Sequence, residues 1–412
     1  MKYRWLAEPL ARKFAKPFVH ELFGARQTGK TTLMRDLLPD PALYFDLADP
    51  AERNRLLADV GAFSRACLAL PARTQAHVVL VDEAQTVPAV FDAVQSLYDR
   101  DKKRWRFVLC GSSARKLRLS GANLLPRRSM QHRMFPLTLA ERPPVEKRST
   151  SARSPLPFDS AGDHAALFPP ADLTERLAYG ELPGVVLLDE EDRAEILRSY
   201  VIAHLEEEIR REALVKDWGA FLRFLQWAAV EAGQVVNYAR IADDVGVAPV
   251  TVRSYYQLLE DIFIGFTVPG YSQSTRKNLT STPRFYMFDL GIRHAAAGLT
   301  PGPDVVLSDP GRYLEQWVGI ELWKRLGYLG KGRLHHLRSK DGAEIDSIVE
   351  VENKLVPIEV KWTERPRRED ARHIIRFIEE QKGKAPWGYV VCRVHRPELL
   401  HERVMAIPWQ DF

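Results

Sequence analysis

One eight-residue segment limits what this chain can fold into more than any other feature. Residues 24–31, GARQTGKT, satisfy the pattern GxxxxGK[ST] at every fixed position, between an apolar run at 18–23 and the helical sequence TTLMRDLL. A strand, a glycine-rich loop and a helix in this order turn backbone N–H groups toward a polyphosphate, which argues against a chance glycine loop. The expected phosphate-binding residues are Gly24, Ala25, Arg26, Gln27, Thr28, Gly29, Lys30, Thr31 and Thr32.

The residue types around this loop predict ATP and Mg²⁺ as ligands. Lys30 would reach the β and γ oxygens, and Thr31 offers a hydroxyl to the metal. An apolar strand at residues 77–81 ends in Asp82, which would hold Mg²⁺ through water, and in Glu83, which would polarise the attacking water. A third strand, 107–110, leads to Ser112 and Ser113, which form either a sensor for the γ-phosphate or a helix N-cap.

Length and composition narrow the class of protein. The 412 residues suggest two or three domains, and 45% hydrophobic with 27% charged residues excludes wholesale disorder. A net charge of +5 permits an anionic partner without demanding one. Three distant cysteines exclude a disulfide framework or a CxxC metal cluster, and no leader or membrane-length apolar run is present, so we expect a cytoplasmic protein without membrane contact.

The chain divides into four expected parts. Residues 1–142 alternate short strands with helices, which predicts an α/β fold with a parallel sheet and helices on both faces. Residues 143–172 are rich in proline and serine and predict a linker or loop. Residues 173–300 are mostly helical, and residues 301–412 form a second α/β region.

A helix-turn-helix spacing lies at residues 236–256 within the helical part. The turn falls at Gly246, and a second helix begins at Pro249. The second helix carries residue types suited to phosphate or base-edge contacts with DNA, namely Thr251, Arg253, Ser254 and Tyr255. Winged-helix folds also serve purely as packing modules, so both roles stay open.

Charged residues end two neighbouring strands of the C-terminal part. Asp346 lies in one strand, and Glu359 and Lys361 share a face of the next. Two carboxylates can hold a second Mg²⁺ or Mn²⁺ while a lysine stabilises a pentavalent phosphate. The alternative is a charge pair between strands on a solvated sheet edge.

Four segments, FGARQTGKTTL, VVLVDEAQ, FVLCGSSARKL and ANLLPRRSMQHRMFPLTLAE, resemble the AAA-type ATPases of bacteria and archaea whose C-terminal half is a domain of unknown function. The resemblance covers nearly the whole chain. It implies a P-loop NTPase core in which Asp82 and Glu83 are the Walker B pair, with a sensor at Ser112 or Ser113. It also implies a homo-oligomeric ring, such as a hexamer, in which Arg128 or its rival Arg133 completes a neighbour's site.

The C-terminal residues Asp346, Glu359 and Lys361 resemble the PD-(D/E)xK nuclease motif, and Glu315 matches the acidic helix position that precedes it. This resemblance implies a restriction-endonuclease-like fold with Glu315 as a further metal ligand. We therefore expect an ATPase that acts on single-stranded, duplex or branched DNA through a winged helix and a nuclease-like domain. The alternatives are a protein that binds or remodels DNA structures without cutting, and a regulatory ATPase whose partner is another protein.

Overall fold

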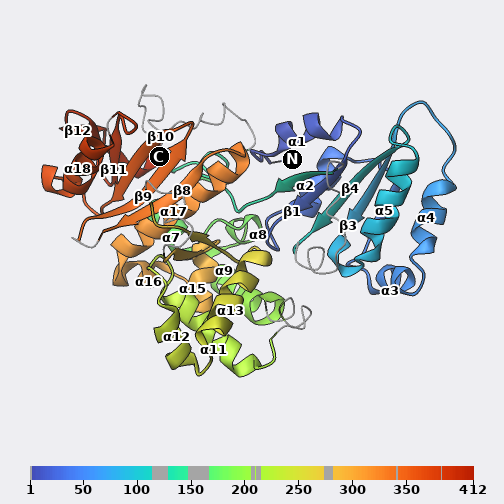
Figure 1. Ribbon diagram of the computed structural model, residues 1–412, viewed down its shortest axis with the longest axis horizontal. Coiled ribbons are helices and arrows are strands. Elements are labelled where there is room, and N and C mark those ends of the chain that lie inside the picture. The colour runs from blue at the N-terminus through green and yellow to red at the C-terminus, as the bar shows by residue number, and fades with distance from the viewer. Residues whose placement is uncertain are drawn as a thin grey trace. The chain divides into compact units, whose positions relative to one another are not determined.

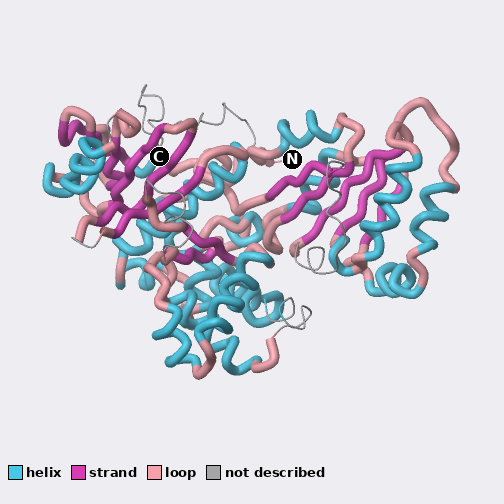
Figure 2. The backbone as a smooth tube through the Cα atoms, in the orientation of Figure 1, coloured by secondary structure: helices cyan, strands magenta, loops and turns pink. Residues whose placement is uncertain are grey.

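The computed structural model describes residues 2–113, 129–146, 167–205, 209, 215–272, 282–339, 342–381 and 383–412. The chain forms two compact units, which Figure 1 draws as a ribbon and Figure 2 as a tube. Unit 1 comprises Met1–Phe135 and Asp261–Phe263, and unit 2 comprises Pro136–Glu260 and Ile264–Phe412. Each unit has its own sheets and buried core, so each is described by itself.

Unit 1 contains a parallel sheet of five strands in the order β2-β3-β4-β1-β5. The strands are β1 (Val19–Phe23), β2 (Leu43–Asp46), β3 (His77–Asp82), β4 (Trp105–Gly111) and β5 (Ser129–Arg133). Because β4 lies between β1 and β3, the carboxyl ends of these three strands meet at one edge of the sheet. The expectation of an α/β fold with a parallel sheet is confirmed for this part of the chain.

Helices make the connections between β1 and β4, because parallel neighbours cannot be joined by a tight hairpin (Figure 2). Unit 1 contains α1 (Ala7–Phe14), α2 (Lys30–Leu37), α3 (Pro50–Ala58), α4 (Gly61–Leu68), the 3₁₀ turn η1 (Ala84–Thr86) and α5 (Ala89–Arg100). Asp49 caps α3 by accepting a hydrogen bond from the N–H of Ala51. The core consists of apolar side chains from the central strands, such as Val79, Val81 and Phe107.

Unit 2 begins with helices. They are α7 (Leu173–Tyr179), α8 (Pro183–Val186), α9 (Glu190–Ser199), the π-helix η2 (Tyr200–Leu205), α11 (Trp218–Val230), α12 (Tyr238–Val245), α13 (Pro249–Asp261), α15 (Leu290–Ala296), α16 (Pro303–Ser308) and α17 (Pro310–Leu329). Acidic or amide side chains cap several N-termini: Asp172, Asp217, Asn237, Asp289 and Asp309 accept from first-turn N–H groups. No helix among the described residues is long and apolar enough to span a membrane.

A mixed sheet of six strands, in the order β12-β13-β11-β10-β9-β8, forms the C-terminal part of unit 2. The strands are β8 (Arg333–Arg338), β9 (Glu344–Val351), β10 (Lys354–Val360), β11 (Gly388–Cys392), β12 (Glu398–His401) and β13 (Val404–Pro408). A separate pair joins β6 (Gly265–Val268) to β7 (Arg284–Met287). The apolar face of α18 (Arg372–Glu380), which follows the 3₁₀ turn η3 (Arg368–Ala371), packs into the core of the large sheet, and η4 (Trp409–Asp411) follows β13.

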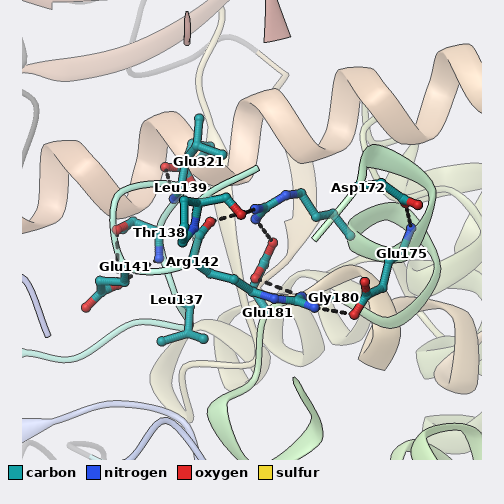
Figure 3. A network of polar contacts seen from close by, with 12 residues as sticks. Leu137, Thr138, Leu139, Glu141, Arg142, Asp172, Glu175, Gly180, Glu181 and Glu321 are labelled. Atoms are coloured by element: carbon teal, nitrogen blue, oxygen red, sulfur yellow. Dashed lines mark hydrogen bonds and ion pairs between the residues drawn. The ribbon is translucent and has the colours of Figure 1, made fainter. Parts of the chain in front are cut away.

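Buried arginines hold the start of unit 2 against α7 (Figure 3). The side chain of Arg142 is 1% exposed and pairs with Glu175 and with Glu181, the latter at 3.3 Å. Arg176 pairs with Glu181 at 2.5 Å and donates to the carbonyl oxygens of Arg142 and Pro143. The carboxylate of Glu181 is thus shared by two buried guanidinium groups.

Hydrogen bonds to charged side chains tie the same segment to α17. The backbone N–H of Leu139 donates to Glu321 at 2.9 Å (Figure 3), and Lys324 donates to the carbonyl oxygen of Leu137. Burial alone would raise the pKa of Glu321, but Lys324 and Arg325 outweigh burial and lower the pKa to about 2. Segment 137–142 is therefore held by charged hydrogen bonds on two sides.

The expected linker at residues 143–172 is described at its two ends. Its middle part, residues 147–166, lies outside the described residues. At the ends, the N–H of Val145 donates to Ala171 at 3.2 Å, and the N–H of Ala171 donates to Pro143 at 3.1 Å. The two ends are therefore hydrogen-bonded to each other.

Candidate functional site

The predicted phosphate loop runs from the end of β1 into the N-terminus of α2. Gln27 and Gly29 have φ angles of 60° and 88°, so the backbone takes left-handed turns just before α2 begins. Gly24 cannot carry a side chain, because a Cβ atom would lie 2.3 Å from the carbonyl oxygen of Met134. The loop thus brings the first N–H groups of α2, which have no partner within the helix, to the carboxyl edge of the sheet.

Lys30 and Thr31 begin α2 and contact different partners. The ammonium of Lys30 donates to the carbonyl oxygens of Gly24 and Ala25, both at 2.8 Å, which uses two of its three N–H donors. The hydroxyl of Thr31 donates to Asp82 Oδ2 at 2.7 Å. Hydroxyl and carboxylate oxygens are ligands that Mg²⁺ prefers, so this pair fits a nucleotide-bound Mg²⁺.

Glu83, Gln85 and Ser112 join the ends of β3 and β4. Glu83 has a left-handed φ of 51°, and its Oε2 accepts from Gln85 Nε2 at 2.5 Å. The hydroxyl of Ser112 lies 3.4 Å from the same oxygen and 3.1 Å from Gln85 Nε2. Ser112 and Ser113 are buried, and the alternative of a helix N-cap falls on residues after 113, which lie outside the described part. The sensor candidate thus contacts the candidate base.

Two residues of this site were missed by sequence reasoning. Arg4 is 5% exposed and donates to the carbonyl oxygen of Thr28 at 2.6 Å and to that of Phe135 at 2.7 Å. A lone arginine twenty-four residues before Thr28 carries no sequence signal. Gln85 could have been found, since it follows the acidic pair in the segment VDEAQ and a turn there returns its amide to Glu83.

Only one of the two arginines expected to complete a neighbour's ATP site lies among the described residues. Arg128 lies outside the described residues. Arg133 ends β5, and its backbone is in register with Phe23, directly before the phosphate loop. Its guanidinium carbon lies 5.0 Å from the ring centre of Phe135 and 4.8 Å from that of Phe263. Arg133 is thus packed on aromatic rings of its own chain.

The helix-turn-helix of unit 2 has the expected spacing. Gly246, with φ of 80°, ends α12, and α13 follows after two residues. Arg253 is exposed and lies 4.8 Å above the ring of Tyr238, while the hydroxyl of Ser254 donates within its own helix. Thr251 is partly exposed on the same helix.

Tyr255 does not lie on the surface that we expected it to share with Arg253. It is 6% exposed, and its ring lies 5.0 Å from that of Phe221 and 5.2 Å from that of Phe224. The expectation that Tyr255 contacts DNA is wrong, because the helix turns this ring into the core of the bundle.

The C-terminal charged residues come together as strand pairing predicts. β9 and β10 are antiparallel neighbours, and Asp346 Oδ2 accepts from the N–H of Val360 at 2.9 Å. Lys361 donates to Glu359 Oε1 at 2.8 Å, while Glu359 Oε2 is buried without a hydrogen-bond partner among the described residues. Glu315 reaches this cluster from α17.

Arg284 in β7 also belongs to this cluster, and no sequence signal pointed to it. It is 3% exposed and pairs with Glu315 at 2.6 Å, with Glu344 at 2.5 Å and with Asp346 Oδ1 at 3.9 Å. Burial and the neighbouring Asp346 carboxylate raise the pKa of Glu315 to about 8 and that of Glu359 to about 7.

The expectation that Glu315, Asp346 and Glu359 form a metal centre is not met. Among the described residues, no group of three or more His, Cys, Asp or Glu side chains is placed to hold a metal ion. The physical reason lies in the pairing: Glu315 and Asp346 face Arg284, and Glu359 faces Lys361. In this arrangement two cations of the chain itself face these carboxylates.

Comparison with known families finds matches to three parts of the chain. The N-terminal part, residues 17–142, matches an AAA domain. This match supports an AAA-type P-loop ATPase, in agreement with the parallel sheet and the loop geometry. Residues 170–302 and 310–412 match two domains of unknown function, DUF8612 and DUF4143.

Curated relatives extend across most of the chain. Uncharacterized proteins of Mycobacterium bovis (Mb2031c) and Mycobacterium tuberculosis (Rv2008c) are each 24% identical over 363 residues, which cover 87% of this chain and 74% of theirs. An uncharacterized protein of Haemophilus influenzae is 24% identical over 361 residues, covering 84% of this chain and 82% of its own. Among solved structures, protein VC1899 from Vibrio cholerae matches at 14% identity over 92% of this chain and 90% of that one, with a TM-score of 0.17.

Proposed function

We propose that this protein binds ATP with Mg²⁺ and hydrolyses it as an AAA-type ATPase. One observation carries the proposal: the phosphate loop, the Thr31–Asp82 contact and the Glu83–Ser112 contact all lie at the carboxyl edge of one parallel sheet. Ligands of open α/β sheets bind at this edge. The AAA match supports the same reading.

Each side chain has a role in this proposal. Lys30 offsets charge on the β and γ oxygens, and Thr31 and Asp82 hold the Mg²⁺, which neutralises further charge when bound. Glu83 accepts a hydrogen bond from the attacking water and polarises it. Gln85 and Ser112 position Glu83, since both contact its Oε2.

The test compares Glu83→Gln with the parent protein in ATP binding and in phosphate release. The amide keeps the shape of the carboxylate but cannot accept a proton, so binding should persist while hydrolysis falls at least a hundredfold. Glu52→Gln is the matched control, because Glu52 pairs with the exposed Arg55 on α3. A Glu83→Gln protein that hydrolyses ATP at the parental rate would remove Glu83 from the mechanism.

A second proposal is that the ATPase acts on DNA through unit 2. Arg253 and Ser254 are exposed on α13, and Thr251 is partly exposed there. A cavity of about 250 Å³ beside α12 is lined by Trp227, Arg240 and Arg338, a combination of ring and guanidinium groups suited to nucleic acid. Stimulation of ATP hydrolysis by single-stranded, duplex or four-way DNA would support this role, and an unchanged rate together with no DNA binding would refute it.

We further propose assembly into a ring in which Arg128 completes the ATP site of a neighbour, as the AAA resemblance implies. Subunits with Arg128→Ala and an intact loop should regain hydrolysis when mixed with Lys30→Ala subunits. If no mixing ratio restores activity, the trans arginine is excluded. The same experiment with Arg133→Ala tests the rival residue.

A further inference from the structure

The carboxylate cluster of unit 2 supports an inference that does not depend on ATP hydrolysis. Four acidic side chains gather where β9, β10 and α17 meet: Glu315, Glu344, Asp346 and Glu359. Buried acids repel one another unless cations or protons intervene. The chain itself supplies two cations, Arg284 and Lys361.

Arg284 contacts three of the four acids through its two terminal nitrogens. Its Nη1 lies 2.6 Å from Glu315 and 3.9 Å from Asp346 Oδ1, and its Nη2 lies 2.5 Å from Glu344. Nη1 also donates to the backbone carbonyl oxygen of Asp346 at 3.5 Å. A guanidinium offers several N–H donors in a fixed plane, so one residue can bridge acids from different elements.

The backbone holds Arg284 in place. It begins β7, and its residue position is paired with Val268 of β6 and bridged to Val235. The side chain is 3% exposed, less than those of its partners Glu315 at 21% and Asp346 at 11%. The cation is therefore the innermost member of the cluster, not a surface charge that happens to lie nearby.

We propose that Arg284 is the resident cation of this cluster and keeps a divalent metal away from Glu315 and Asp346. Arg284 Nη1 lies 2.6 Å from Glu315, which is a charge-assisted hydrogen bond, so this carboxylate oxygen already faces a cation. A second cation beside Asp346 would be repelled by the guanidinium. Lys361 satisfies one oxygen of the remaining acid, Glu359.

If Arg284 has this role, the C-terminal part can keep its fold without catalysing metal-dependent cleavage. The cluster joins β7, α17 and the large sheet through ion pairs, so it stabilises unit 2. A domain whose acids are paired internally can bind DNA, but it lacks the metal that activates water for phosphodiester hydrolysis. The inference therefore favours recognition over cutting for any action on DNA.

The test is Mn²⁺ binding to the full-length, nucleotide-free protein, measured by electron paramagnetic resonance. The parent and Asp346→Asn should give the same isotherm, because any Mn²⁺ bound elsewhere is common to both. Arg284→Met should gain one additional Mn²⁺, bound at least tenfold tighter than any shared site, and the gain should vanish in Arg284→Met/Asp346→Asn. Arg333→Met, at an exposed arginine of β8, is the matched control and should gain none.

Two results would overturn the proposal. The first is a Mn²⁺ ion in the parent that Asp346→Asn or Glu359→Gln removes, since the acids would then hold a metal despite Arg284. The second is a folded Arg284→Met protein that gains no Mn²⁺, since Arg284 would then not be what excludes the metal. Should Arg284→Met fail to fold, the comparison of parent with Asp346→Asn still decides whether these acids hold a metal in the parent protein.

Discussion

The phosphate loop of unit 1 and the carboxylate cluster of unit 2 lie at the ends of buried strands and contain similar residue types, but they balance charge differently. In unit 1, Asp82 is bonded to the hydroxyl of Thr31, and Lys30 is bonded to neutral carbonyl oxygens. In unit 2, Glu315 and Glu344 face the guanidinium of Arg284. The first site keeps its ionic charges for a ligand, whereas the second uses them within the chain.

This difference gives a physical criterion for separating binding sites from structural ion clusters. A ligand site forgoes internal ion pairs and so costs stability, which the ligand restores when it binds. A structural cluster pairs its ions and loses stability when one partner is removed. Substitutions in the two regions should therefore change different quantities.

The largest expected effect is that of Lys30→Ala on nucleotide turnover. Removal of the cation aimed at the β and γ phosphates should abolish hydrolysis and weaken ATP binding at least a hundredfold. The free energy of unfolding should fall by only about 1 kcal/mol, because the lost hydrogen bonds go to neutral carbonyls. ATP titration and chemical denaturation of the same protein measure both. If Lys30→Ala lost much stability but still bound ATP, Lys30 would be a structural residue and the contrast between the two sites would be wrong.

The opposite pattern is expected for Glu321→Gln in unit 2. The change leaves Lys324 and Arg325 buried beside an uncharged partner, which costs about 3–5 kcal/mol for a broken buried pair. Hydrogen exchange should speed up across α17, while the dissociation constant for ATP stays at the parental value. Glu380→Gln, in an exposed pair with Arg376, is the matched control and should change stability by less than about 1 kcal/mol.

A smaller effect is expected from pH in unit 1. His20 and His132 are buried and lie 3.3 Å apart, and burial lowers their pKa values to about 4 and about 3. The unfolded chain takes up protons near pH 6.5 while the folded chain does not, so the free energy of unfolding falls as the pH falls below 6.5. We expect these two side chains to contribute a loss of about 2 kcal/mol between pH 6.5 and 5.5, and His132→Gln should remove about half of that contribution. A His132→Gln protein that loses as much stability between these pH values as the parent would contradict this.

The smallest effect is expected for Arg253→Ala on DNA binding. One exposed guanidinium that contacts phosphate should contribute less than about 1 kcal/mol, so affinity should fall two- to fivefold. The slope of log affinity against log salt should decrease by about 1. Arg12→Ala, in an exposed pair on α1, should leave both values unchanged.

The sequence predicted best where several neighbouring residues act together. The loop at 24–31, the acidic end of β3 and the pairing of Asp346 with Glu359 all follow from local pattern and strand geometry. The direction in which a single side chain points was harder to predict from the sequence. Tyr255 has the residue type of a DNA contact, but the helix period turns it inward onto Phe221.

The distant partners of a lone side chain outside any motif could not be predicted. Arg4 and Arg284 act on residues that lie 24 and 31 or more positions away, and a lone arginine has no pattern that names its partner. Arg284 mattered most, because the motif of Asp346, Glu359 and Lys361 alone indicated a metal. Only the folded chain brings a cation from β7 to those acids.

The two hydrogen bonds that Arg4 donates, to Thr28 and to Phe135, matter to anyone who isolates the ATPase part. A fragment cut at the family boundaries, residues 17–142, would lack Arg4 and so leave the carbonyl groups of Thr28 and Phe135 without their guanidinium. At its other end it would carry residues 137–142 without Glu181 and Glu321, their partners in unit 2. The boundaries of the family match therefore differ from those of unit 1. Nucleotide assays should use the full chain.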